Sequence, residues 1–148
     1  MIVWGLTATA TAIAMEFWAR IVHDQAWHGF LWGIHRSHHR RNHGRLEAND
    51  LLSFTHAPLA MALIIGACVW PFGWVADVAF GVGVGMTAFG VAYALVHDGF
   101  IHGRLPLAFL AHIPYFVRVR EAHEQHHKRN AAPYGLFLGP WEPGKTGS

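Results

Sequence analysis

Ten histidines in four short clusters carry the chemistry that this sequence can perform. Two clusters have the pattern His-x4-His and two have His-x2-His-His, and the pair of patterns occurs twice in the same order. The members are His23 and His28, His35, His38 and His39, His97 and His102, and His123, His126 and His127. Neutral imidazole is the commonest protein ligand for iron, zinc and copper. Ten imidazoles exceed the needs of one ion, so the clusters predict a site for two.

The two patterns place different demands on the chain. In His-x2-His-His the later histidines follow the first by three and four residues, so all three share one helix face. In His-x4-His the two are five residues apart, about 140° around a straight α-helix. We therefore expect the helix to end between them, with Gly29 and Gly99 fitting such a break. Ten unrelated surface or core histidines would not produce this repeated order.

Other polar residues near the clusters leave alternatives open. Glu16 either pairs with Arg20 on the same helix face or accepts the free N–H of a ligand histidine. Asp98 and Asp24 each follow a cluster histidine, and either orient an imidazole or cap a helix end. Asn49 and Asp50 indicate first a helix N-cap, with an outer-shell role as the second interpretation.

Three histidines lie outside the clusters. We expect His43, in an arginine-rich loop, to be solvated. For His56 and His112, a hydrogen-bonded structural role is favoured over a metal ligand.

Apolar segments predict the elements that position the clusters. Residues 2–22, 54–75 and 77–96 are each long enough to cross a bilayer, and the last two form a hairpin around Trp70–Trp74. Gly81, Gly83, Gly85 and Gly90 would permit close backbone approach to a neighbouring helix or to a ligand. Residues 105–117 contain two prolines and are too short to cross, so they predict a re-entrant or interfacial segment. The fold class is thus an all-α polytopic membrane protein with about three full spans.

Composition and charge agree with a membrane location. The chain has 53% hydrophobic and 14% charged residues, against about 45–50% and 25% in soluble domains. Its 148 residues allow one domain, 1–148, and no cleavable signal peptide is expected. The span order puts all four clusters on one membrane side. Most Lys and Arg residues share that side, which predicts a cytoplasmic metal face. The basic residues are interleaved with the predicted ligands, which makes nucleic-acid binding a poor alternative. The single cysteine, Cys68, is expected to be a buried, inert thiol.

The ligand set narrows the metal and the reaction. Clusters of nitrogen ligands without cysteine argue against iron–sulfur chemistry, and a closed zinc site uses four ligands rather than ten. Two ions with about five imidazoles each leave room for dioxygen. This favours two irons that use O2 to attack an unactivated C–H bond of a lipid-soluble hydrocarbon.

The residues around the clusters resemble those of bacterial β-carotene hydroxylases, in the fatty acid hydroxylase and sterol desaturase superfamily of membrane di-iron enzymes. The resemblance covers residues 15–138. It rests on Trp32-Gly33, Ser37-His38-His39, Asn49-Asp50-Leu51 and His97-Asp98-Gly99 beside the clusters.

The resemblance implies 3-hydroxylation of β-ionone rings, from β-carotene through β-cryptoxanthin to zeaxanthin. It implies O2 as cosubstrate, electrons from a ferredoxin or similar donor, a bacterial inner membrane location, and the ten clustered histidines as ligands of two irons. Zinc can replace iron in such imidazole sites. Alternatives are a related ketolase, a fatty acid or sterol hydroxylase, or a non-catalytic membrane protein that binds metal or haem. Residues 128–137 depart from the family pattern. If this stretch lines the substrate channel, the departure affects ring specificity, and we expect it to leave the metal site untouched.

Overall fold

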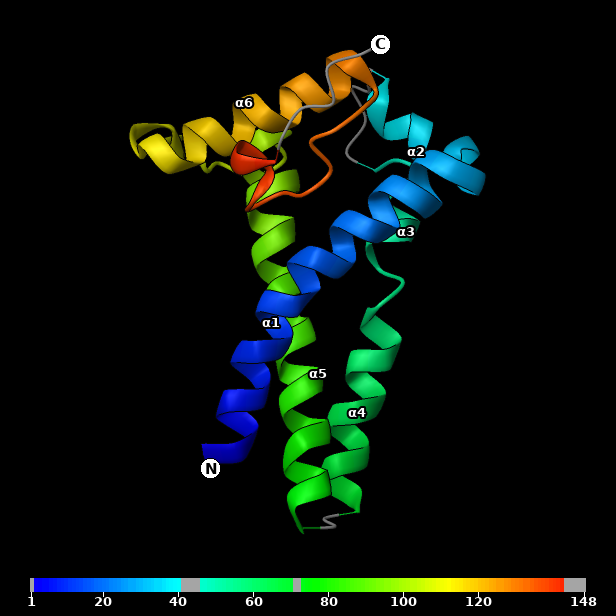
Figure 1. Cartoon of the computed structure of the whole chain (residues 1–148), viewed down its shortest axis with the longest axis vertical. Coiled ribbons are helices and arrows are strands. Elements are labelled where there is room, and N and C mark those ends of the chain that lie inside the picture. Colours follow the sequence, from blue (N-terminus) through cyan, green and yellow to red (C-terminus); the bar gives the residue numbers. More distant parts are fainter. Residues whose placement is uncertain (1, 41–45, 71–72, 143–148) are drawn as a thin grey trace. The chain divides into compact units, whose positions relative to one another are not determined.

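The computed structural model describes residues 2–40, 46–70 and 73–142, in which every regular element is a helix (Figure 1). This confirms the all-α prediction. The chain divides into two compact units: unit 1 contains Met1–Met15 and Leu51–Ala92, and unit 2 contains Glu16–Asp50 and Tyr93–Ser148. The sequence predicts one membrane domain over residues 1–148, and this stays a prediction.

Three helical stretches are long and apolar enough to cross a membrane, as predicted. They are Ile2–Phe30, Asp50–Val69 and Gly73–Ile101. The first joins α1 (Ile2–Val22) to the π-helix η1 (His23–Phe30). The second contains α3 (Asp50–Ser53) and α4 (Ala57–Val69), and the third joins α5 (Gly73–Tyr93) to the π-helix η2 (Ala94–Ile101). The second stretch thus begins earlier than expected and the third ends later.

Small residues on α5 let the helices of unit 1 approach closely. A Cβ at Gly81 would lie 2.6 Å from the carbonyl oxygen of Trp4, and one at Gly83 would lie 2.8 Å from that of Ala60. A Cβ at Gly85 would collide with the carbonyl oxygen of Ala8. Within unit 1, α5 therefore packs against α1 and α4, which confirms the hairpin.

Gly90 does not take part in this helix packing, because nothing lies within 4 Å of the Cβ position there. Pro71 and Phe72 of the expected turn lie outside the described residues, and Gly73 begins α5 with φ of +52°.

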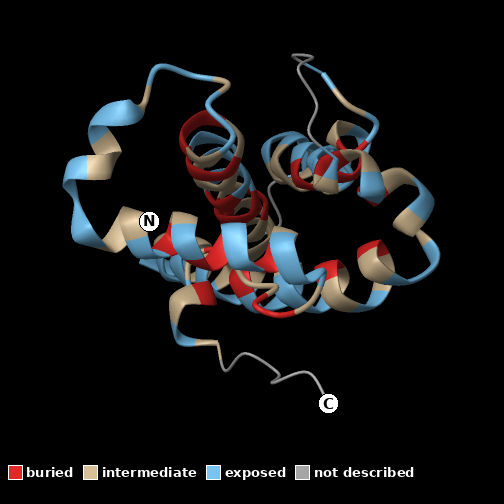
Figure 2. Ribbon diagram, turned by 90° about the horizontal axis from the view of Figure 1, so that it is seen from above, coloured by how far each residue is buried: buried red, intermediate tan, exposed pale blue. Residues whose placement is uncertain are grey.

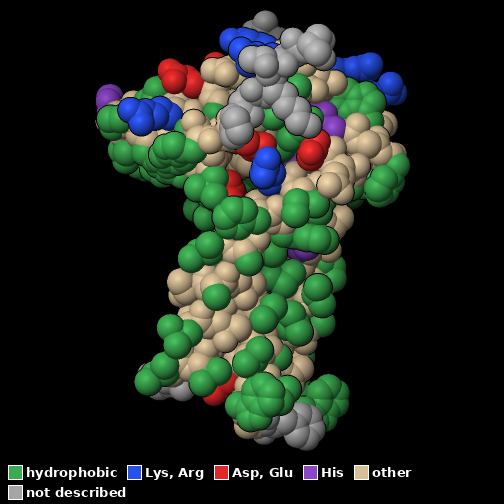
Figure 3. Space-filling view, in the orientation of Figure 1, with side chains coloured by type: hydrophobic (Ala, Val, Ile, Leu, Met, Phe, Trp, Pro, Cys, Tyr) green, Lys and Arg blue, Asp and Glu red, His purple; other side chains and the backbone are tan. Residues whose placement is uncertain are grey.

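The outer surface of unit 1 is apolar. Large exposed side chains on it include Leu6, Ile13, Leu59, Ile65 and Val91. The sequence of this unit contains no Lys or Arg, and Figure 3 shows hydrophobic side chains over the visible face of α4 and α5. An apolar surface of this kind fits contact with lipid. The thiol of Cys68 is exposed on it, so the prediction of a buried thiol was wrong.

Unit 2 carries the shorter elements: α2 (Trp32–His39), the 3-10 helix η3 (Ala108–His112), α6 (Pro114–Arg129) and the 3-10 turn η4 (Gly139–Trp141). The segment at residues 105–117 is broken at the extended Ile113, which confirms that it is not a full span. A small core of Val96, Phe100, Val119 and Leu136 packs within the unit. Most residues of the described helices are exposed or intermediate in burial, and buried residues are the minority (Figure 2).

Candidate metal centre

Each His-x4-His pair lies in or next to a π-helical turn. A π-helix closes i→i+5 hydrogen bonds, which brings residues five apart onto nearly one face. The backbone N–H of His102 donates to the carbonyl of His97 at 3.0 Å, which is this i→i+5 pattern. The ring centroids of His23 and His28 lie 5.1 Å apart in the other turn. The helix therefore widens between the two histidines, and the prediction that it ends between them was wrong. A non-helical backbone at Gly29 follows the first pair.

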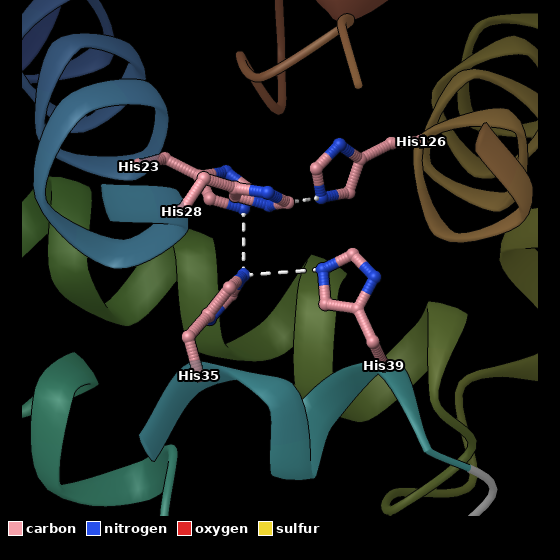
Figure 4. Close-up of side chains that lie close together, drawn as sticks. All are labelled: His23, His28, His35, His39 and His126. Atoms are coloured by element: carbon pink, nitrogen blue, oxygen red, sulfur yellow. Dashed lines mark hydrogen bonds between the residues drawn. The ribbon is translucent and has the colours of Figure 1, made fainter. Parts of the chain in front are cut away.

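One set of five histidines, the first histidine group, converges from three elements. Its members are His23 and His28 on η1, His35 and His39 on α2, and His126 on α6. One nitrogen from each lies within 4.8 Å of all the others, so the group could hold a metal ion. Figure 4 shows the five imidazoles pointing toward a common centre. The Nε2 of His35 is 3.0 Å from that of His23 and 3.2 Å from that of His39.

The second histidine group comprises His38 on α2, His102 after η2, and His123 and His127 on α6. It meets the same criterion for a metal site. His97 lies beside it, because its Nε2 is 3.0 Å from Nε2 of His38. The Nε2 atoms of His102 and His123 are also 3.0 Å apart. The structure thus brings all ten predicted histidines together, five in each place.

In the first group, the outer nitrogens donate to neutral acceptors. Nδ1 of His23 donates to the carbonyl of Tyr134 at 2.9 Å, and Nδ1 of His126 donates to the carbonyl of Ala131 at 2.8 Å. Nδ1 of His35 donates to Oδ1 of Asn49 at 2.7 Å. Asn49 thus has the second of its two predicted roles: it lies behind a histidine and accepts its N–H. Asn49 is itself positioned by its backbone N–H, which donates to the Ser37 hydroxyl at 3.0 Å.

At the second group, the outer nitrogens of His38 and of the adjoining His97 meet carboxylates. Nδ1 of His38 donates to Oε1 of Glu47 at 2.9 Å, and Nδ1 of His97 donates to Oδ1 of Asp98 at 3.0 Å. Arg104 joins this network, donating to the same Oε1 of Glu47 and to Oδ1 of Asp50, each at 2.8 Å. Asp98 therefore orients an imidazole, and Asp50 acts through Arg104.

These outer hydrogen bonds fix the ring tautomers. A carbonyl or carboxylate oxygen can only accept a hydrogen bond, so Nδ1 must carry the proton. In a neutral ring, Nε2 then carries no proton and presents a lone pair. The Nε2 atoms of His23 and His35 nevertheless face each other at 3.0 Å, as do those of His38 and His97. Two lone pairs at this distance repel unless a proton or a metal ion lies between them.

A metal ion fits these positions better than a proton. Two nitrogens each about 2.1 Å from an ion and about 90° apart would be about 3.0 Å from each other. In addition, Nε2 of His127 is buried without a hydrogen-bond partner among the described residues. A buried nitrogen without a partner is rare in native proteins, and a site for an ion is one of its recognised causes.

Burial and crowding also disfavour protonation of the rings. Burial lowers the pKa of His35 to about 4, and burial with repulsion from His126 lowers the pKa of His39 to about 3. Burial and the neighbouring His97 hold the pKa of His38 well below its usual range. These imidazoles are therefore neutral at pH 7, as metal ligands must be. Burial raises the pKa of Glu47, whereas the guanidinium of Arg104 opposes that rise.

Two other side chains have partners that differ from those expected. Oε1 of Glu16 accepts from the backbone N–H of Leu138 at 2.8 Å, and not from Arg20 or a histidine. Arg20 instead donates from Nε to Oε1 of Glu142 at 2.8 Å. Burial raises the pKa of the Tyr134 hydroxyl, and the charge and hydrogen bond of Asp24 add to that rise.

The segment after the last cluster also differs from expectation. It was expected to leave the metal site untouched, yet its Ala131 and Tyr134 carbonyls accept from two histidines of the first group. This expectation was wrong because backbone atoms make the contacts, and side-chain identity does not reveal them.

Sequence reasoning missed Glu47 and Glu142 as functional positions. Glu47 stands two residues before Asn49, so the same acidic segment could have indicated it. Glu142 carries no signal, because its partners are backbone amides and a distant arginine. Of the remaining histidines, His56 contacts the Thr55 hydroxyl at 3.2 Å and His112 is exposed. His43 lies outside the described residues.

Comparison with known proteins agrees with this site. The model of the fatty acid hydroxylase family matches residues 8–143. The chain is 44% identical over 142 residues to the chloroplastic beta-carotene 3-hydroxylase of Gentiana lutea, covering 95% of this chain and 44% of that protein. It is 36% identical over 145 residues to the beta-carotene hydroxylase of Pantoea ananas, covering 93% of this chain and 79% of that protein.

The chain spans less than half the length of the curated plant relatives that it matches. No solved structure matches it. The extent of the family match and the similarity to the Pantoea protein together establish that this chain belongs to the fatty acid hydroxylase family.

Proposed function

We propose that this chain is a membrane di-iron monooxygenase that hydroxylates C3 of the β-ionone rings of β-carotene, forming β-cryptoxanthin and then zeaxanthin. The observation that carries the proposal is the pair of facing Nε2 lone pairs, His23 with His35 and His38 with His97, each at 3.0 Å. Two such pairs call for two cations. The beta-carotene hydroxylases among the relatives, which match 93–95% of this chain, support the substrate.

The ligands of the two ions follow from the two histidine groups. We assign His23, His28, His35, His39 and His126 to one ion, and His38, His97, His102, His123 and His127 to the other. Iron is the metal that suits the reaction, because zinc has no redox chemistry and hydroxylation requires electron transfer. Imidazole sites accept both metals, so recombinant protein can contain zinc.

The reaction balances with dioxygen and two electrons. A ring C–H bond is replaced by C–OH, the second oxygen atom leaves as water, and two protons are consumed. The irons, when bound, supply the activation of O2. The residues of the chain hold the imidazoles neutral and in one tautomer, through Tyr134, Asn49 and Ala131 on one side and through Glu47 and Asp98 on the other. The electrons come from a ferredoxin or similar donor.

The membrane arrangement follows from charge. All Lys and Arg residues belong to unit 2, which also holds the ten histidines, and unit 1 has none. By the positive-inside rule, the metal centre lies on the cytoplasmic side of a bacterial inner membrane. A carotenoid is about as long as the bilayer core is thick, ~30 Å, so one ring can reach a metal centre at the membrane surface while the rest of the molecule stays in the bilayer.

Pigment analysis tests the proposal directly. The chain is expressed in bacteria that accumulate β-carotene, and the carotenoids are separated by chromatography. We expect β-cryptoxanthin and zeaxanthin with the natural sequence and with His112→Ala, and unchanged β-carotene with His126→Ala. His112 is the matched control, because it is exposed and belongs to neither group.

Other outcomes point to the alternatives. Ketone products would identify a ketolase that uses the same centre. Unchanged β-carotene from iron-loaded membrane protein supplied with a ferredoxin system would contradict the carotenoid substrate, and fatty acids or sterols would be tested next. Bound metal without O2 consumption on any lipid would indicate a non-catalytic metal-binding protein.

A further inference from the structure

The two histidine groups differ in the charge of what lies behind them. Behind the first group, His23 and His126 donate to backbone carbonyls and His35 donates to the amide oxygen of Asn49. One carboxylate, Asp24, interacts with His28 through its charge and is hydrogen-bonded to the Tyr134 hydroxyl, but it accepts no hydrogen bond from a ring of this group among the described contacts. The hydrogen-bond acceptors of these three rings, His23, His35 and His126, are therefore all neutral.

Behind the second group and the adjoining His97, two rings donate to anions. His38 donates to Glu47 and His97 donates to Asp98. Asp50 lies in the same network, and Arg104 is the cation within it, 2.8 Å from Glu47 and Asp50 and 3.8 Å from Asp98. Three carboxylates against one guanidinium leave a net charge of −2 beside this group.

A carboxylate behind an imidazole makes the ring a stronger ligand. It pulls the Nδ1 proton toward itself, which increases electron density at Nε2 and raises ligand basicity. The excess negative charge also attracts the ion directly, and it does so more strongly where water is excluded. Neutral carbonyl and amide acceptors fix the tautomer but supply neither effect to the same degree.

We infer that the two metal positions are unequal, that the second histidine group binds its ion more tightly, and that Glu47 is the positioning residue chiefly responsible. The inference rests on the proposed metal centre. Glu47 holds this role because its side chain is 5% exposed and its Oε1 receives both His38 Nδ1–H and Arg104 Nη2–H. Asp98 makes the weaker case, since its side chain is 21% exposed.

The structure offers a reciprocal pair of substitutions. Both contacts of Glu47 go to one oxygen, so the amide oxygen of a glutamine can accept both, and Glu47→Gln removes charge while keeping the hydrogen bonds. Asn49 accepts from His35 through Oδ1, so Asn49→Asp adds a charge behind the first group at nearly constant shape. One substitution weakens the tighter site and the other strengthens the weaker site.

The test is a metal-binding isotherm of the full chain in detergent, stripped of metal and supplied with Co²⁺ or anaerobic Fe²⁺. We expect two ions per chain, bound in two steps whose affinities differ by about 10- to 100-fold, the usual effect of an outer-shell partner. Glu47→Gln should bring the tighter step toward the weaker one, and Asn49→Asp should bring the weaker step toward the tighter one. Glu124→Gln, which alters only an exposed pair with Arg120, should change neither. Mössbauer spectra of the 57Fe-loaded chain should show two unlike irons.

Two ions bound with equal affinity would overturn the inference and leave the proposed function standing. So would Glu47→Gln and Asn49→Asp isotherms that match that of Glu124→Gln. If Glu47→Gln fails to fold, Asn49→Asp decides alone, because the inference requires it to tighten the weaker step. A natural chain that binds no ion would instead contradict the proposed metal centre itself.

Discussion

Arg20 donates from Nε to Oε1 of Glu142 at 2.8 Å, although the two residues are 122 positions apart in the sequence. The other oxygen of Glu142 accepts the backbone N–H groups of Tyr134 and Gly135, at 3.0 and 2.9 Å. Tyr134 in turn presents its carbonyl to His23. Glu142 therefore holds the backbone turn that orients a histidine of the first group, without touching the histidine itself.

The first prediction concerns this turn. Glu142→Ala leaves the N–H groups of Tyr134 and Gly135 without their acceptor, so the carbonyl that orients His23 is no longer held. We expect metal affinity to fall about 10-fold, since loss of an outer-shell partner costs 10- to 100-fold. Metal content per chain after dialysis against a weak chelator measures this.

Two further variants serve as controls for Glu142→Ala. Glu121→Ala removes an exposed glutamate from α6 and should leave metal content unchanged. Arg20→Ala should change metal content little. The Arg20 side chain is 52% exposed, and an exposed ion pair contributes only about 0–1 kcal/mol to the stability of the contact. A loss as large for Arg20→Ala as for Glu142→Ala would show that the ion pair, and not the turn, is what matters.

The second prediction concerns His97, whose Nε2 lies 3.0 Å from that of His38. If both rings bind the same ion, His97→Ala should lower the metal content from about two ions per chain to about one. The first histidine group should keep its ion, because its nitrogens come from other residues. Inductively coupled plasma analysis of purified protein measures the ratio. A ratio still near two would show that His97 is a partner of His38 and not a ligand.

The third prediction concerns the pH range of metal binding. Burial and crowding lower the pKa of His35 to about 4 and those of His102 and His126 to about 3. In the folded chain, protons therefore compete with metal only below about pH 5, and not near the unperturbed value of about 6.5. We expect metal content to stay constant from pH 8 to pH 5.5. Release with a midpoint near 6.5 would contradict the lowered pKa values.

The same shifts set the stability of the metal-free chain. Unfolded histidines take up protons below about pH 6.5, whereas the folded, metal-free rings stay neutral until their lower pKa values are reached. Protons thus favour the unfolded state between these limits, and stability falls as the pH falls through this window. Thermal unfolding of chelated protein at pH 7.5 and 5.5 measures this, with a lower midpoint expected at pH 5.5.

The fourth prediction compares two glycines of α5 within unit 1. A Cβ at Gly85 would meet the Ala8 carbonyl and the Thr11 side chain, so Gly85→Ala should destabilise the packing by about 1–3 kcal/mol. Nothing lies within 4 Å of the Cβ position at Gly90, and alanine favours a helix over glycine. Gly90→Ala should be neutral or stabilising by up to about 1 kcal/mol. Circular dichroism during heating in detergent separates the two.

Much of the fold follows from apolar length alone. The three spanning stretches and the broken segment at residues 105–117 could be predicted because the cost of unpaired backbone in lipid permits few alternatives. The clustering of the ten histidines could also be predicted, since their spacing leaves few helical arrangements.

The partners of single polar side chains could not be predicted in the same way. Glu16 and Arg20 are correctly spaced for a helical pair, yet each bonds to the segment at residues 134–142. That contact depends on tertiary structure, which local spacing does not encode. The carbonyls of Ala131 and Tyr134 were missed because every residue has a carbonyl, and only the fold selects which ones a histidine meets.

The wide turns at His23–Phe30 and Ala94–Ile101 have a consequence for the surfaces of the two helices that carry them. Each wide turn adds about one residue to a helical repeat, which shifts the phase of the side chains that follow by about 100°. In α5, residues three and four positions apart share one helix face. This rule does not hold across η2, so residues after η2 lie on a different face from the one that the spacing in α5 would predict. Deleting one residue from η2 would restore the regular phase, and His102 would then rotate away from its place opposite His123.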